Sequence, residues 1–405
     1  MINLSKKQSV LLLTSIGLSV LSPSIFAKDQ RTVVEPKTPQ VCKVLLATGT
    51  DSTKTIQSAL NSCAAGKAVQ LASNKAIKSF TSGAITIPSN RSLIINSDVV
   101  LKASNNAKAF DNGTNTCGKL AKTGNGCNAL ITFEKASNSG IYGNGTIDGQ
   151  GGAKIAGSNS SWWDLAAQAK NSPNKQNAPR LIQINSSNNI TLHKVKMTNS
   201  PNFHVVFKQS NGLTAWGITI KTPGTARNTD GIDPISSQNV TVAHSNISTG
   251  DDNVAIKANP GAGASKNMSF LNNTFGAGHG MSIGSETTDG VYGIDVNGLI
   301  MNGTTNGLRI KSDQSASGIV SGVRYEHVTM TNVKKPVVID TVYENKAGKT
   351  KALWSNIFYN DIKTTTAGAI VINGKNASKP IQAEFKGLNL AAGTTWNIVN
   401  ANIKK

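Results

Sequence analysis

Two short stretches of this chain place carboxylates where they could act together. The stretch STGDDNVAIK at 248–257 contains Asp251 and Asp252 side by side, and NTDGID at 228–233 contains Asp230. Adjacent carboxylates repel each other, although a single Asp is an ordinary turn residue. Three crowded carboxyl groups suit hydrolysis of a glycosidic bond, in which one protonated acid faces the leaving oxygen and a base activates water. Their repulsion would raise at least one pKa and keep a proton available near neutral pH.

A repeated pattern after residue 180 indicates how these acids are positioned. Each repeat joins a short run, such as NITL at 189–192, to a second run such as GIDP, NVAIK, GMSIG, GLRIK or KPVVID. When the second runs are aligned on their first apolar residue, the spacings are 22, 27, 27 and 29 residues. The aligned residues are Ile232, Val254, Met281, Leu308 and Val337. Such a period is typical of a solenoid, and strand-like units with Asn- and Gly-rich turns predict an all-β fold, a parallel β-helix, rather than a β-sandwich.

The same alignment lines up the polar residues that precede these strands. Asp230, Asp252, His279 and Asn306 each stand two places before the aligned apolar residue. Successive coils of a β-helix lie about 4.8 Å apart, so residues in one register form a row. Asp251 is expected beside this row.

Alternation along the strands predicts what surrounds the row. With the aligned residues in the core, Arg309 and Lys311 point outward, two residues apart, and so do the small residues Ser282 and Gly284. The outer wall is therefore predicted to form a groove with carboxylates at its centre and cations beside them. Arg309 and Lys311 are expected to bind a substrate carboxylate, the arginine through two parallel hydrogen bonds.

Helical periodicity appears in two places only. Within 51–63 the apolar residues fall on one face, with Asp51 or Ser52 as a possible cap, and a second candidate helix covers 162–170. The first helix is predicted to cover the N-terminal end of the β-helix, where an open strand edge would otherwise invite pairing with another chain.

Four cysteines are present: Cys42, Cys63, Cys117 and Cys127. In an oxidising compartment this even number suggests two disulfides, for which three pairings are possible. Pairing of neighbours, Cys42 with Cys63 and Cys117 with Cys127, closes the shortest loops and is preferred. A zinc site is disfavoured because the sequence has no CxxC pair, and no metal is expected.

The N-terminus resembles a secretory signal. Residues 1–27 contain Lys6 and Lys7, a mostly apolar run at 10–21 and a small residue, Ala27, before the expected cut. The apolar run is too short for a membrane anchor, and no later stretch is long enough to span a bilayer. The mature protein is therefore predicted to comprise 28–405 as a single domain, secreted and not held in a membrane.

The charge balance predicts a polyanionic partner. The formal net charge is +20, and it is +18 once the signal is removed. Such an excess attracts nucleic acid or an acidic polysaccharide. Export and an aromatic content of only 5% disfavour nucleic acid, because single-strand binding relies on aromatic platforms.

Four ordered segments resemble the signature of a known family. They are NTDGID at 228–233, GDDNVAIK at 250–257, GHGMSIGS at 278–285 and RIK at 309–311, with further likeness in GTIDGQGG at 145–152 and VYEN at 342–345. The chain is thereby similar, over essentially its whole mature length, to the polygalacturonases of glycoside hydrolase family 28. The likeness is greatest to secreted endo-polygalacturonases of plant soft-rot bacteria.

The resemblance implies a right-handed β-helix that cleaves α-1,4 bonds between galacturonic acids of de-esterified pectin, by inversion, as a monomer without cofactor. It implies Asp251 as general acid, and Asp230 and Asp252 as the residues that activate water. His279 would tune the acid. Substrate binding would fall to Arg309, Lys311, Asn228 and Tyr343. For inversion, at least one pair of carboxyl groups is expected about 6.5–9.5 Å apart.

Other functions stay open at this point. A pectate lyase would use Ca²⁺ and leave an unsaturated product, and a non-catalytic binder of acidic glycans could use the same scaffold. Endo action is favoured over exo because no large insertion would close the groove. His204, Trp162 and Trp163 are expected to pack or hydrogen-bond, and Lys257 is expected to point outward at the surface. The recurring asparagines are expected to stack as ladders at the turns and not to bind ligands.

Overall fold

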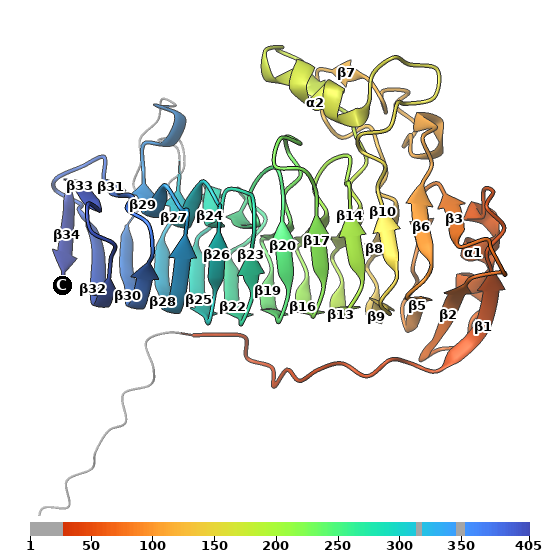
Figure 1. Ribbon diagram of the computed structural model, residues 1–405, viewed down its shortest axis with the longest axis horizontal. Helices are drawn as coiled ribbons and strands as arrows, with labels where there is room; N and C mark the ends of the chain where they lie inside the picture. Colours follow the sequence, from red (N-terminus) through yellow and green to blue (C-terminus); the bar gives the residue numbers. More distant parts are fainter. Residues whose placement is uncertain (1–26, 313–317, 346–352) are drawn as a thin grey trace, which may run out of the picture.

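The chain folds as a parallel β-helix whose strands stack coil upon coil along one axis (Figure 1). The computed structural model describes residues 27–312, 318–345 and 353–405, so the predicted signal lies outside the described residues apart from Ala27. The predicted fold class is confirmed. The strands form three parallel ladders, two of which merge at β28, and these ladders are the faces of the solenoid.

The bounds of the strands follow the three ladders. The first contains β1 (Val41–Leu46), β2 (Lys67–Ala72), β5 (Arg91–Ile95), β9 (Ser137–Tyr142), β13 (Asn188–His193), β16 (Asn211–Trp216), β19 (Gln238–Ala243), β22 (Ser265–Leu271), β25 (Val291–Asn297), β28 (Val320–Thr331), β30 (Trp354–Thr364), β32 (Ile381–Asn389) and β34 (Ala401–Lys404). The second contains β3 (Ser79–Ser82), β6 (Val100–Ala103), β10 (Thr146–Asp148), β14 (Lys196–Thr198), β17 (Thr219–Lys221), β20 (Asn246–Ser248), β23 (Thr274–Phe275) and β26 (Ile300–Asn302). The third contains β4 (Ile85–Thr86), β8 (Ile131–Glu134), β12 (Ile182–Asn185), β15 (Val205–Lys208), β18 (Ile232–Ile235), β21 (Val254–Ala258), β24 (Met281–Thr287), β27 (Asn306–Lys311), β29 (Lys335–Asp340), β31 (Ala369–Asn373) and β33 (Thr395–Val399).

The register of the third ladder is the one that the sequence repeat predicts. Ile232 pairs with Val254, Val254 with Met281, Met281 with Leu308, and Leu308 with Val337. All five side chains are buried in the core. Unequal spacings of 22 to 29 residues are accommodated outside the aligned residues, which stay in register; β21 and β24 shift register only after Ile256.

Asparagines at the turns stack as predicted. Asn90, Asn138 and Asn189 all have positive φ, a region that Asn tolerates better than most residues. The Asn189 amide donates to Asn138 Oδ1 at 2.7 Å, and the Asn138 amide lies 3.4 Å from Asn90 Oδ1. This ladder of side chains keeps neighbouring turns in step.

The N-terminal end is covered by helix α1 (Thr53–Ser62), slightly shorter than predicted. Its apolar face buries Ile56, Ala59 and Leu60 against the first coils. The Cys42–Cys63 disulfide ties the end of the helix to β1, in the pairing expected from the sequence. Core side chains at this end are therefore shielded from water.

One region between β6 and β12 projects from the body of the solenoid (Figure 1). It comprises α2 (Trp162–Lys170), which starts at a capping box formed by Ser161 and Asp164, and the antiparallel pair β7 (Leu120–Ala121) and β11 (Lys175–Gln176). Trp162 is buried, and Trp163 Nε1 donates to the Ser200 carbonyl at 2.9 Å, so both tryptophans have structural contacts.

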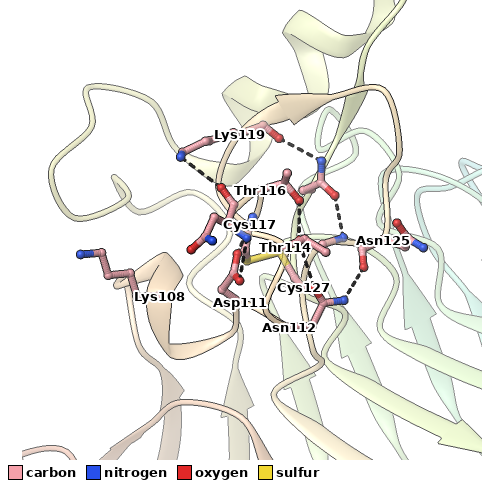
Figure 2. Close-up of a disulfide and its surroundings, with 12 residues drawn as sticks. Lys108, Asp111, Asn112, Thr114, Thr116, Cys117, Lys119, Asn125 and Cys127 are labelled. Atoms are coloured by element: carbon pink, nitrogen blue, oxygen red, sulfur yellow. Dashed lines mark hydrogen bonds between the residues drawn. A yellow bond between two sulfur atoms is a disulfide. The ribbon is translucent and has the colours of Figure 1, made fainter.

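The second disulfide, Cys117–Cys127, lies at the base of this projection and again has the predicted pairing (Figure 2). Asp111 accepts hydrogen bonds from the backbone N–H groups of Cys117 and Asn115, both at 3.0 Å. A cross-link with local hydrogen bonds holds the loop that precedes β7 (Figure 2).

An unpredicted strap, residues 29–35, runs back along the outside of several coils (Figure 1). Asp29 Oδ2 accepts a hydrogen bond from Thr241 Oγ1 at 2.6 Å and forms an ion pair with Arg31. Further along, Glu35 pairs with Lys194 at 2.7 Å. The strap therefore links coils that are not adjacent to one another.

Leu60→Ala should lower the free energy of unfolding by about 2–5 kcal/mol, because it opens a cavity under the capping helix. Lys54→Ala, on the exposed side of the same helix, is the matched control and should change it little. Urea denaturation measures both. Equal midpoints for the two variants would show that α1 does not shield the core.

Candidate active site

Four strands of the third ladder, β18, β21, β24 and β27, deliver the predicted row of polar residues. Backbone hydrogen bonds continue the ladder into the loops before these strands. Gly231 N–H donates to the Asp252 carbonyl at 2.9 Å, and His279 N–H donates to the Asp251 carbonyl at 2.8 Å. These bonds hold Asp252 between neighbouring coils, so the loop acids keep the spacing of the strands.

Asp252 lies at the centre of a buried ion-pair cluster. One of its oxygens accepts from Arg309 Nη2 and, at 2.9 Å, from Ser282 Oγ, and the other accepts from Lys311 Nζ at 3.0 Å. Burial alone would raise the pKa of Asp252, but the charges of Arg309 and Lys311 outweigh it and hold this pKa well below its usual range. Asp252 is therefore a fixed carboxylate.

Asp251 has a different environment. Its Oδ1 lies 3.2 Å from His279 Nδ1, and its Oδ2 accepts from the backbone N–H of Asn228 at 3.3 Å. Burial raises the pKa of Asp251, whereas the hydrogen bond from His279 lowers it, and the net shift is downward. The expectation of a raised pKa within the acid group is thus met by other carboxyls, not by Asp251.

Asp230 and Asp233 are those carboxyls. Both are buried, and Asp230 Oδ1 and both Asp233 oxygens have no hydrogen-bond partner among the described residues. Burial, followed by the charges of Asp233 and Asp251, raises the pKa of Asp230 well above its ordinary value. Burial raises the pKa of Asp233 to about 7, although Lys257 opposes this.

Sequence reasoning missed Asp233, and it underestimated Lys257. Asp233 directly follows the aligned residue Ile232, so the same alternation that placed Arg309 on the outer face should have placed Asp233 there. Lys257 is not an ordinary surface residue, because it is only partly exposed and its charge acts on Asp230 and Asp233.

The remaining predicted residues gather at the same place. Lys311 Nζ lies 5.1 Å from the centre of the Tyr343 ring, in the short helix η2 (Tyr343–Asn345). Asn228 Oδ1 lies 3.4 Å from Gln176 Nε2 of β11, which connects the site to the projecting wall. All eight predicted residues therefore lie in one region, and their roles are treated below.

A cavity of about 780 Å³ adjoins this cluster on the side of the projection. Its lining includes Asn228 beside Asp251 and four cations, Lys122, Lys175, Arg180 and Arg227. No acidic residue is found among the described residues that line it. The cavity is therefore suited to an anionic ligand.

One oxygen or nitrogen from each of Asp251, Asp252 and His279 lies within 4.8 Å of the others, which is a spacing that could hold a metal ion. Both Asp252 oxygens, however, already bind Arg309 or Lys311. A cation would have to displace these charges, so the cluster does not fit a metal site. One carboxylate oxygen of Asp251 lies within 4.8 Å of one oxygen of Asp252. The separation of about 6.5–9.5 Å expected between two carboxyl groups stays a prediction.

His204 supports the site from beneath. It is fully buried, its Nε2 lies 2.7 Å from Thr222 Oγ1, and its Nδ1 lies 3.0 Å from the Asp230 carbonyl oxygen. Burial lowers the pKa of His204 to about 4. Its observed contacts are structural, in keeping with the hydrogen-bonding role considered from the sequence.

The sequence model described as "Glycosyl hydrolases family 28" matches residues 63–405. The chain belongs to glycosyl hydrolase family 28. It is a glycoside hydrolase, and the resemblance noted from its motifs is confirmed.

Individual members of family 28 match over most of the chain. An endo-polygalacturonase of Pectobacterium carotovorum subsp. carotovorum is 57% identical over 392 residues, which cover 96% of this chain and 97% of that protein. A polygalacturonase of Ralstonia nicotianae is 41% identical and covers 80% of this chain and 72% of its own length. The solved polygalacturonase from Erwinia carotovora ssp. carotovora has a TM-score of 0.91 at 57% identity and covers 93% of this chain and 100% of its own.

The titration of His204 should make stability depend on pH. The unfolded chain binds a proton below about pH 6.5, whereas the native imidazole excludes it down to about pH 4. Stability relative to His204→Gln should therefore rise by about 3 kcal/mol as the pH increases from 4 to 6.5. Urea denaturation at several pH values tests this, and a constant difference between the two proteins would contradict it.

Proposed function

We propose that this family 28 protein is an endo-polygalacturonase, which hydrolyses α-1,4 bonds of polygalacturonic acid. The main support is the row of carboxylates in one β-helix register, flanked by Arg309 and Lys311. A polyanion binder without activity would not need carboxylates at the centre of its groove. The relative that is 57% identical along nearly the whole chain is an endo-polygalacturonase.

The environments of the acids suggest how the work is divided. Asp252 is held as a carboxylate by Arg309 and Lys311, so it is available to bind and orient the attacking water, while Asp230, whose pKa is raised, is the stronger base of the two. Asp251 is more accessible than Asp252 and suits the role of general acid. The attacking water then loses its proton to the Asp230–Asp252 side, while Asp251 gives its proton to the leaving oxygen.

Asp251 must carry a proton when it acts as general acid, and His279 is the neighbouring group that can exchange this proton with it. In the free protein the His279 hydrogen bond favours the Asp251 carboxylate. A bound uronic acid brings negative charge and removes water, and both changes raise the pKa of a neighbouring carboxyl. We infer that substrate binding moves a proton onto Asp251, with His279 as the neighbouring group that exchanges it.

Arg309 and Lys311 can bind both Asp252 and a carboxylate of the substrate. Arg309 Nε donates to Ser282 Oγ at 3.0 Å and its Nη2 donates to Asp252, so we expect it to present its Nη1 edge to a uronate carboxylate. Lys311 lies between Asp252 and the Tyr343 ring, where it can contact the sugar acid and the carboxylate together. Asn228 completes the binding region, beside the cationic cavity.

Export from the cell completes the proposal. Across residues 27–312, 318–345 and 353–405, no helix has the length and apolar character needed to cross a bilayer. The predicted signal at 1–27 and two disulfides support action outside the cell, since disulfides persist in oxidising compartments.

Incubation with polygalacturonate should cause a rapid fall in viscosity, with oligomers of mixed size appearing before monomer. Product sizing over time and an assay for new reducing ends measure this. Release of monomer or dimer alone would mean exo action. Products that absorb in the ultraviolet and disappear with a chelator would instead identify a lyase.

Asp251→Asn should reduce kcat at least about 10²-fold, because the amide cannot donate a proton to the leaving oxygen, while polygalacturonate binding is largely kept. Asp98→Asn, at an exposed position, is the control and should behave like the parent protein. Steady-state kinetics and calorimetric binding measure the two effects. Lost binding with an unchanged rate at saturation would contradict the assignment.

A further inference from the structure

A fourth carboxyl lies on the floor of the site. Asp233 pairs in register with Val206, and the residue that precedes it, Ile232, pairs with Val254. The next residue of that coil, Ala255, pairs with Ser282, and Ser282 pairs with Arg309. Asp233 therefore belongs to the same outward-facing row as Ser282 and Arg309, which bind Asp252.

Asp230 and Asp233, three residues apart along the chain, are both buried carboxyls with unused hydrogen-bonding capacity. Asp233 is fully buried and Asp230 is 3% exposed. Within the described residues, neither oxygen of Asp233 has a partner and Asp230 Oδ1 has none. Buried carboxyls that make no hydrogen bonds are costly, and a proton held between two of them would satisfy both.

The charges that face this pair come from several elements. The cations are Lys257 of β21 and Arg180, which precedes β12. Both lie over the ring of Phe203: Lys257 Nζ is 5.1 Å and the Arg180 guanidinium carbon is 5.4 Å from the ring centre. Asp251 and Asp252 are the other acids that act on it, and Glu286 acts on Lys257. Two cations therefore face the pair and offset the negative charge of the neighbouring acids.

We propose that Asp233 is a positioning residue that shares a single proton with Asp230 and thereby leaves Asp230 able to accept the proton of the attacking water. Lys257 and Arg180 balance the remaining negative charge. Asp233 does not touch the substrate, and it acts only through Asp230. The proposal rests on the proposed function for its effect on rate, but the shared proton itself does not.

Electrostatics agree with this arrangement. Burial raises the pKa of Asp233 to about 7, and Asp233 is the neighbouring charge that most raises the pKa of Asp230. Since the two groups interact, protons leave the pair in two steps that belong to both residues. Between those steps the pair holds one proton and one negative charge.

The test is the pH profile of kcat/KM on polygalacturonate. Asp233→Ala removes the group that holds the shared proton against the Asp230 carboxylate, so Asp230 should bind a proton more readily and the acidic limb should move to higher pH by about one unit. Lys257→Met removes a cation, so the same limb should also move to higher pH. A purely structural role would lower activity without moving the limb, and an unmoved limb or a shift to lower pH in Asp233→Ala would overturn the proposal.

Two further measurements keep the result decisive. Asp295→Asn is the matched control. It alters a buried acid that pairs with Arg324 in the first ladder, and it should leave the acidic limb of the kcat/KM profile in place. If Asp233→Ala does not fold, carboxyl-carbon NMR of the unmodified protein carries the test. Carboxyl-carbon NMR of the unmodified protein needs no substrate: we expect two coupled titration steps for Asp230 and Asp233, and independent titration would overturn the pairing. A protein with those coupled steps that never cleaves polygalacturonate would contradict the proposed function instead.

Discussion

The parallel pairing of successive coils is the constraint on which the rest of this structure depends. It places Asp252 of one coil against Ser282 of the next and Arg309 of the one after, with Lys311 beside them. A slip of one residue in any coil would turn its core residues outward and its polar residues inward. Burial of the aligned residues Val254, Met281 and Leu308 makes such a slip costly, so the hydrophobic core also fixes the geometry of the site.

This geometry gives chemically identical side chains different properties. Asp252 faces two cations and stays ionised, whereas Asp230 and Asp233 are buried with fewer compensating contacts and hold protons more tightly. Asp251 lies between these extremes, with His279 as its partner. Sites that need both an acid and a base at one pH are commonly built from such pairs of environments.

Much of the fold was predictable because the repeat is visible in the sequence. The spacing of the aligned apolar residues gave the strand register, Asn at the turns indicated the side-chain ladder, and apolar periodicity indicated α1 and α2. Other features could not be predicted, because their partners are far away along the chain. The strap at 29–35, whose Asp29 contacts Thr241, has no local signal, and neither has the contact of Lys311 with Asp252.

The sequence by itself determined which residues share a register, since the period of the repeat and the alternation of side chains are local properties. It also identified the family through ordered motifs. Only the tertiary structure decided the charge state of each acid, because desolvation and the distance to Arg309, Lys311, Lys257 or His279 depend on how coils pack. Alternation along the strand could have placed Asp233 on the outer face, but only the folded chain showed that its carboxyl is buried without a hydrogen-bond partner among the described residues.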